Sequence, residues 1–185
     1  MAHYMTTAPE IIEQTAGKLD AFVAASGTAG TIAGTSKRLK EYNPAIKTFV
    51  ADPPGSCIYN YVKTGKLERK GDGSITEGIA NGRVTANLAW GESFIDDALF
   101  IPDERTVEMV FHLLHKEGIF VGASSALNAV AAVEAARVVG PGKVVTTVLC
   151  DTGVRYASRL LSAAWLDSKG LYDAVPDYAR ASLLP

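Results

Sequence analysis

The stretch VAASGTAGTIAG, residues 23–34, decides the fold. An apolar run ends there in a cluster of small residues, and helical spacing begins directly after it. The pattern predicts a short strand over residues 19–26 (LDAFVAAS), a helix over 30–42 that ends at Asn43, and a second strand over 45–52 (AIKTFVAD). A strand, a tight turn, a helix and a strand form a βαβ unit, whose two strands are parallel.

Helices and strands alternate along the rest of the chain, which predicts an α/β fold with an open, mainly parallel sheet and helices on both faces. Asp103 is a candidate cap for one helix, and Gly118 ends it. The strongest strand pattern is KVVTTVLCDTG, which is typical of a strand buried on both faces. Helices are expected at residues 8–17, 103–118, 124–140 and 155–170, and strands at 119–124 and 143–153.

Composition indicates one globular domain over residues 1–185. Of these residues 48% are hydrophobic and 21% are charged, and the formal net charge is −2. That charge gives no reason to expect nucleic acid or an anionic membrane as a partner. No apolar run approaches the roughly 20 residues of a membrane helix. The N-terminus lacks the pattern of a secretory signal, so we expect a cytoplasmic protein.

The cysteines and histidines do not suggest a metal site. Cys57 and Cys150 are too few for a disulfide framework and are expected to be reduced thiols. Their spacing from the histidines matches no zinc pattern. His112 and His115 could share a helix face but lack a third ligand, so a solvated or partly buried face is expected, and His3 is expected at a frayed end.

Residues 61–100 form the least regular part of the sequence, and the tail at 171–185 has no strong pattern either. Polar and glycine-rich stretches predict a long irregular region that lines an active site, because long ordered loops tend to be functional. The neighbours Asp96 and Asp97 are expected in a turn at the surface. Trp90 and Trp165 are expected in the core or in an interface.

The turn after the first strand has the composition of an anion-binding loop. The first amides of a helix have no intrahelical partner and carry partial positive charge. Small residues let a phosphate approach, and two threonines add hydroxyl donors, so no lysine or arginine is needed. The same spacing also fits a tight turn without a ligand. The residues of this loop are Gly27, Thr28, Ala29, Gly30 and Thr31.

Two nucleotide-binding motifs fit this loop poorly. A Walker loop requires a lysine that is absent here. A dinucleotide fold requires glycines at another spacing than Gly27, Gly30 and Gly34. Asp52 stands about where such a fold places its acidic residue, but two prolines follow it and an aspartate at a strand end is common in turns.

Four ordered stretches resemble the cysteine synthases, which are fold-type-II enzymes that use pyridoxal 5′-phosphate (PLP). The segment DAFVAASGTAGTIAGTSKRLKE is similar to the phosphate loop of that family. SITEGIANGRVTANL, EGIFVGASSALNAVAA and VVTTVLCDTGVRYASRLL follow in the family's order, and together the resemblance covers about residues 8–169. It implies a single PLP phosphate-binding domain with the C-terminal fold of this class.

The resemblance assigns cofactor roles to particular residues. Gly27, Thr28, Ala29, Gly30 and Thr31 match the loop around the PLP phosphate. The family usually has glycine where Ala29 stands. A methyl group at that position would crowd the phosphate or restrict a backbone with positive φ.

Two later positions also match the family's cofactor site. Gly78 matches a turn that lines the cofactor face near the substrate. Thr152 matches the hydroxyl residue at the pyridine nitrogen, where a neutral group leaves the ring a milder electron sink, as β-replacement requires. The adjacent Asp151 is the alternative partner. Neighbours at a strand end point in opposite directions, so only one of the two should reach the ring, and Thr152 is favoured.

Three features of the family's N-terminal half do not occur in this sequence: the Schiff-base lysine in a Ser-x-Lys motif, the asparagine at the cofactor phenol oxygen, and the Thr-Ser-Gly-Asn loop for the substrate carboxylate. The resemblance therefore implies the C-terminal half of a cysteine synthase, with no catalytic residue of its own. The lysines present lack that context: Lys18, Lys37, Lys40, Lys47, Lys63, Lys66, Lys70, Lys116, Lys143 and Lys169.

The intact family replaces the leaving group of an activated serine, such as O-acetylserine, by sulfide to give L-cysteine. The resemblance implies these small molecules as partners and a possible homodimer, with the lone chain inactive. Two alternatives stay open: a non-catalytic module that binds a phosphate ligand or a partner, and a related PLP enzyme such as a cystathionine β-synthase, a serine/threonine dehydratase or a tryptophan synthase β subunit. The strings CDTGVRY and ITEGI favour cysteine synthase.

Overall fold

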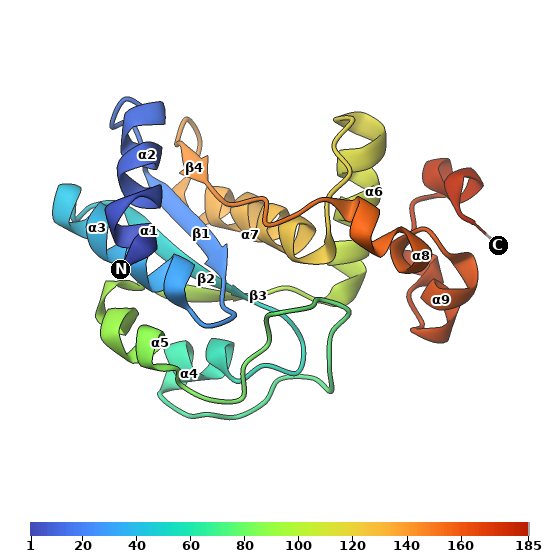
Figure 1. Ribbon diagram of the computed structural model, residues 1–185, viewed down its shortest axis with the longest axis horizontal. Coiled ribbons are helices and arrows are strands. Elements are labelled where there is room, and N and C mark those ends of the chain that lie inside the picture. The colour runs from blue at the N-terminus through green and yellow to red at the C-terminus, as the bar shows by residue number, and fades with distance from the viewer. Residues whose placement is uncertain (185) are drawn as a thin grey trace.

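A four-stranded, all-parallel sheet forms the centre of the molecule (Figure 1). The structure is a computed structural model that describes residues 1–184. The strands lie in the order β3-β2-β1-β4, and each neighbouring pair is parallel, which confirms the predicted fold class. Their bounds are Ala21–Ala25 (β1), Lys47–Asp52 (β2), Asp97–Phe100 (β3) and Val145–Thr146 (β4).

Helices cover both faces of this sheet. Successive side chains of β1 point to opposite faces, so neighbouring residues pack against different helices. Phe22 packs in the cluster that includes α3 (Gly30–Tyr42), whereas Val23 packs in the cluster that includes α7 (Ala123–Val139). Both side chains are fully buried. Burial of each contributes about 2 kcal/mol to the free energy of unfolding.

The predicted βαβ unit is present at the predicted position. The helix begins at Gly30 and ends at Tyr42, before an extended Asn43. The five residues of β1 pair in register with β2, from Ala21 with Lys47 onward. The two strands therefore end at the same edge of the sheet, where the loop after β1 opens.

The other helices lie around this unit, and in Figure 1 α8 and α9 stand beyond α6 at one end of the long axis. Helices α2, α6 and α7 occur where the sequence predicted them. The remaining elements are α1 (Ala2–Met5), α2 (Thr7–Gln14), α4 (Ile58–Thr64), α5 (Ala86–Gly91), α6 (Asp103–Lys116), α8 (Ala157–Leu160), α9 (Ala163–Ser168) and the 3-10 turns η1 (Glu92–Phe94), η2 (Gly153–Tyr156), η3 (Tyr172–Ala174) and η4 (Asp177–Ser182).

The N-terminus is more ordered than its pattern predicted. Helix α1 packs on α3, where a Cβ at Gly34 would stand 3.1 Å from the backbone of α1. The expectation that His3 lies at a frayed end is wrong. Its ring contacts the Thr7 hydroxyl at 3.0 Å and the Thr31 hydroxyl at 3.2 Å. The close approach of two helices, which no local pattern reveals, orders this end of the chain.

Residues 61–100 are less irregular than predicted, since they contain α5 and β3. The neighbours Asp96 and Asp97 do not form a simple surface turn. Asp97 begins β3, and Asp96 accepts a hydrogen bond from the Thr48 amide at 2.7 Å and pairs with Lys40 at 2.7 Å. These contacts join β3 to β2. The short strand β3 therefore forms through its pairing with β2, and the sequence pattern of β3 does not predict it.

The two late strands were predicted incorrectly. The strand expected at 119–124 is absent from the described residues except for one bridge between Val121 and Thr152. The strand expected at 143–153 shortens to β4, an edge strand whose continuation is exposed at Leu149 and Cys150. Asn128 of α7 explains this. Its Oδ1 accepts from the Ala25 amide and its Nδ2 donates to the Val148 carbonyl, each at 2.8 Å, in place of a backbone ladder.

The helix expected over residues 155–170 is also divided, into η2, α8 and α9. A new cap marks the second break, because the Ser162 hydroxyl accepts from the Trp165 amide. Helix α9 and the tail after it pack on α6 through a cluster that includes Phe111 and Leu166. The tail thereby gains turns that the sequence did not indicate.

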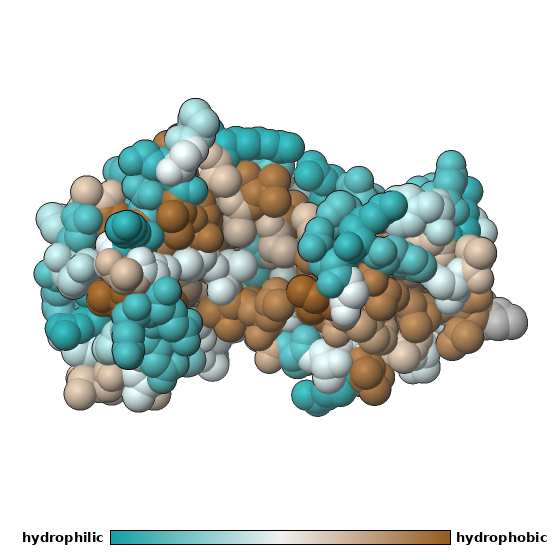
Figure 2. Space-filling view, turned by 90° about the horizontal axis from the view of Figure 1, so that it is seen from above, coloured by the Kyte–Doolittle hydropathy of each residue, from teal (hydrophilic) through white to brown (hydrophobic). Residues whose placement is uncertain are grey.

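Hydrophobic side chains gather along the middle of the face shown in Figure 2 and continue toward its right-hand end, with hydrophilic residues mainly at the left and along the upper edge. Exposed apolar residues occur on α7 and before β4, where Val133, Val138 and Val144 are 41%, 64% and 40% exposed. Across residues 1–184, no helix combines the length and the apolar character needed to cross a membrane.

Candidate functional site

The loop between β1 and α3 ends in a strained residue. Ala29 is the N-cap of α3 and has left-handed backbone angles, with φ +64°. Its methyl group has no oxygen that could accept from the first amides of α3, so these amides lack a capping side chain. They form the positive end of a 13-residue helix.

This loop opens into a cavity of about 370 Å³ at the carboxyl edge of the sheet. Three other segments complete the wall: the loop before α5, the start of α7, and the segment around η2. The predicted loop residues and Gly78 all lie on this wall, and Thr152 does not. The lining residues are Ala25, Gly27, Thr28, Ala29, Gly30, Thr31, Glu77, Gly78, Ile79, Ser124, Cys150, Asp151 and Tyr156.

The carbonyls of the loop are bound by side chains that the sequence did not single out. The Asn81 amide donates to the Gly27 carbonyl. The Thr28 carbonyl accepts from the Thr85 hydroxyl at 2.8 Å and from the Asn87 amide at 3.1 Å. The polar residues of the motif NGRVTANL were the only signal in the sequence for these contacts. Their side chains donate hydrogen bonds to the carbonyl oxygens of the loop, so the loop presents mainly amide and hydroxyl donors to an anion.

Gly27 and Gly78 approach each other closely across the cavity mouth. A Cβ on Gly27 would collide with the Gly78 carbonyl oxygen, so only glycine allows this contact. Gly78 itself has φ +75° and open space beside it. The turn expected near the substrate therefore lies directly against the loop expected to hold phosphate.

Asp151 and Thr152 occupy different places. Asp151 accepts a hydrogen bond at Oδ2 from the Tyr156 hydroxyl at 2.6 Å, which raises the pKa of Tyr156. Its Oδ1 is buried and has no hydrogen-bond partner among the described residues. Thr152 is exposed and caps η2, with its hydroxyl accepting from the Val154 amide at 3.4 Å.

The wall of this cavity contains no lysine, arginine or histidine in the part of the chain that the structure describes. The wall also includes the carboxylates of Glu77 and Asp151, but on residues 27–31 themselves an anion would meet amides and hydroxyls. Those donors suit a phosphate, which binds helix N-termini without a cationic side chain. The residues present therefore fit a phosphate group, and the buried Asp151 oxygen offers a further unpartnered acceptor.

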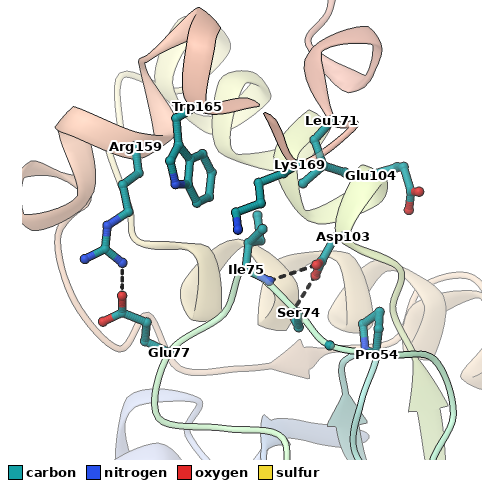
Figure 3. A pocket seen from close by; sticks show the side chains of 11 residues that line it. Pro54, Ser74, Ile75, Glu77, Asp103, Glu104, Arg159, Trp165, Lys169 and Leu171 are labelled. Atoms are coloured by element: carbon teal, nitrogen blue, oxygen red, sulfur yellow. Dashed lines mark hydrogen bonds and ion pairs between the residues drawn. The ribbon is translucent and has the colours of Figure 1, made fainter. Parts of the chain in front are cut away.

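A second cavity, of about 680 Å³, lies next to the first and shares Glu77 with it (Figure 3). Asp103, expected to cap α6, is instead its first residue, and Pro102 is the N-cap. The Asp103 carboxylate faces Ser74 and Ile75, because α6 meets the loop there (Figure 3). Burial raises the pKa of Asp103.

Asp52 lies outside both cavities. It is fully buried at the end of β2, where its Oδ2 accepts from the Tyr59 amide at 2.7 Å and its Oδ1 has no partner in residues 1–184. Burial raises the pKa of Asp52 to about 6. Asp52 therefore binds the start of α4, and it does not take the ribose-binding role that a dinucleotide fold would give it.

Of the remaining candidates only Cys150 lines the first cavity. His112 and His115 are exposed on α6, as expected. Trp90 is 42% exposed with Lys37 over its ring, which contradicts a core position, whereas Trp165 lines the second cavity. No group of three potential metal-ligating side chains occurs in the described residues, and both cysteines are free, with Cys57 buried and Cys150 exposed.

Residues 1–151 match the family model described as "Pyridoxal-phosphate dependent enzyme". Cysteine synthase 1 of Neurospora crassa is 50% identical over 181 residues, which cover 97% of this chain and 48% of that relative. The putative mitochondrial cysteine synthase of Saccharomyces cerevisiae is 40% identical over 178 residues, covering 90% and 44%.

A solved structure is similar as well. The O-acetylserine-dependent cystathionine β-synthase from Helicobacter pylori has a TM-score of 0.74 and 35% identity, covering 85% of this chain and 48% of its own. The chain spans about half the length of the curated relatives it matches.

Proposed function

The chain belongs to the family of pyridoxal-phosphate-dependent enzymes, and we propose that it is the part of a cysteine synthase that binds the cofactor phosphate. One observation carries the proposal: the uncapped start of α3 lies on a cavity wall that has no cationic side chain. The whole enzyme would replace the leaving group of O-acetylserine by sulfide, giving L-cysteine. The names of the fungal relatives support this reaction.

The phosphate would lie on the loop of residues 27–31. Amides at the start of α3 and the hydroxyls of Thr28 and Thr31 are its donors, and the helix dipole favours the negative charge. The contacts of Asn81 and Thr85 with the loop carbonyls keep these oxygens away from the anion. PLP supplies an electron sink for chemistry at the amino-acid Cα when it is bound.

The partner of the pyridine nitrogen is one of two neighbours. Sequence resemblance favours Thr152, whereas Asp151 lies on the cavity wall with an unpartnered oxygen. A hydroxyl would leave that nitrogen unprotonated, and a carboxylate would hold it protonated. Thr152→Val and Asp151→Asn separate the assignments, because the larger loss of PLP affinity belongs to the residue that meets the ring.

We further propose that this chain alone does not catalyse the reaction. The family's chemistry depends on a lysine that removes the Cα proton, and no described lysine lines the cavity. Gly78 would then form part of the substrate-facing wall while the proton-transferring group comes from outside residues 1–184. Cytoplasmic location and a homodimer remain part of this proposal, although one relative is named mitochondrial.

The test is a titration of the purified chain with PLP, followed by absorbance. We expect reversible binding, no adduct after borohydride, and no cysteine from O-acetylserine and sulfide above a PLP-only blank. Thr28→Val should weaken PLP binding by roughly tenfold, and Thr64→Val, on exposed α4, should not. Turnover above the blank, or an adduct on one lysine, would contradict the inactive assignment. An absence of PLP binding would contradict the phosphate-site assignment.

The similarity to an O-acetylserine-dependent cystathionine β-synthase favours one alternative reaction, in which a thiol replaces sulfide as nucleophile. Both reactions share the same activated serine, so residues 1–184 support either. Assays of the whole protein with sulfide and with homocysteine distinguish them. A preference for homocysteine would overturn the cysteine synthase assignment but not the phosphate site.

A further inference from the structure

The loop that carries Glu77 and Gly78 to the cofactor cavity is not held by its own backbone. Residues 71–80 make no backbone–backbone hydrogen bond within the described part of the chain. They belong to no helix or strand. The position of this loop therefore depends on contacts made by side chains.

One buried carboxylate makes two hydrogen bonds to this loop. Asp103 is only 9% exposed, and it accepts hydrogen bonds from the Ser74 hydroxyl at 2.6 Å and from the Ile75 amide at 2.8 Å (Figure 3). The Ser74 hydroxyl also contacts that of Thr76 at 2.7 Å. Hydrogen bonds to an ionised acceptor are about twice as strong as neutral ones, and the start of α6 favours negative charge.

The other end of the loop is tied less firmly. Glu77 pairs with Arg159 of α8, but the two side chains are 51% and 48% exposed. Exposed pairs of this kind contribute little because water and salt screen them. Of these two polar anchors, Asp103 is therefore the stronger, while Ile75 and Ile79 add apolar packing against the core.

We propose that Asp103 is a positioning residue of the cofactor site. Its carboxylate holds Ser74 and Ile75, and through them it determines where Glu77 and Gly78 stand on the cavity wall. Asp103 itself lines only the second cavity, so it acts through the loop rather than on the cofactor. This role rests on the proposed function, because it assumes that PLP occupies the first cavity.

Three variants of the chain test this role by two measurements: hydrogen–deuterium exchange of residues 74–80 and the Kd for PLP. Asp103→Ala should raise exchange in this loop about tenfold and the Kd by roughly three- to tenfold. Asp103→Asn should restore most of both, because its amide can accept from Ile75 and donate to Ser74. Glu104→Ala is the matched control, since it removes the next acidic residue of α6, which makes no hydrogen bond to the loop, and should change neither.

Ser74→Ala keeps the proposal testable if Asp103→Ala does not fold, since it removes the partner hydroxyl and leaves the carboxylate of α6 in place. It should raise loop exchange without lowering the midpoint of urea unfolding. Unchanged exchange in both Asp103→Ala and Ser74→Ala would overturn the anchor. Faster exchange with an unchanged Kd would overturn its role in cofactor binding. If the unmodified chain binds no PLP, the proposed function itself fails, while the exchange data still report whether Asp103 holds the loop.

Discussion

Two walls of the proposed cofactor cavity are built in different ways. The wall of β1 and α3 is supported by a five-residue parallel ladder to β2 and by a continuous helix. The wall around Asp151 follows an edge strand of two residues and is held by the side chains of Asn128 and Ser125. Backbone ladders follow from local periodicity, whereas side-chain bridges depend on residues distant in sequence, so the first wall was predictable and the second was not.

Asn128→Ala should break the second wall with the largest effect. Asn128 is buried, and its loss leaves the Ala25 amide and the Val148 carbonyl without partners. We expect a loss of about 4 kcal/mol in the free energy of unfolding, measured in urea. Asn60→Ala, which removes an exposed hydrogen bond to Glu68, is the control and should cost under about 1 kcal/mol. Equal losses in the two variants would contradict a special role for Asn128.

Asp52→Asn should show that β2, the strand that supports the first wall, ends in a buried charge. The pKa of Asp52 in the folded chain, about 6, exceeds its ordinary value of 3.8, so the folded state binds more protons between these values. Stability should therefore fall as pH rises from about 4 to above 6, by roughly 3 kcal/mol. Asp52→Asn should lose this part of the pH dependence and exceed the unmodified chain in stability at pH 7. Identical pH profiles from urea unfolding would refute the assignment.

Ala29→Gly should relax the strain in the first wall. Glycine adopts positive φ without the steric cost that an alanine has there, so we expect a gain of about 1 kcal/mol and tighter binding of PLP. Ala16→Gly, at φ +49° and away from the cavity, is the matched control. It should stabilise the chain without changing PLP affinity. A loss of stability in Ala29→Gly would show that its methyl group contributes more through packing than it costs in strain.

Arg159→Ala should have the smallest effect, because it removes an exposed pair between the loop of Glu77 and α8. We expect a change under about 0.5 kcal/mol that fades in high salt. A double-mutant cycle with Glu77→Gln measures the coupling directly. A coupling above about 1 kcal/mol would mean that this surface contact joins the Glu77 loop to α8 more firmly than its exposure indicates.

Much of the cofactor wall could be predicted because it is local. The small residues of the loop lie between a strand and a helix, so their place at the carboxyl edge follows from the βαβ pattern. Gly78 could be placed only through family resemblance, since nothing in its own segment indicates that Gly27 packs against its carbonyl. Asp103 was correctly predicted at the start of a helix, but its predicted role as the cap was wrong. Its carboxylate instead binds a loop about 28 residues earlier in the sequence.

The amino-acid sequence was sufficient to predict the fold class, the βαβ unit and the place of the small-residue loop between β1 and α3. These depend on periodicity and on the first amides of one helix, which are properties of contiguous residues. Only the tertiary structure decided the length of β4, the order of α1, the anchor at Asp103 and the position of Asp151 on the cavity wall. Each of these depends on which distant groups satisfy a buried polar atom or fill a close contact, and a linear pattern does not record that pairing.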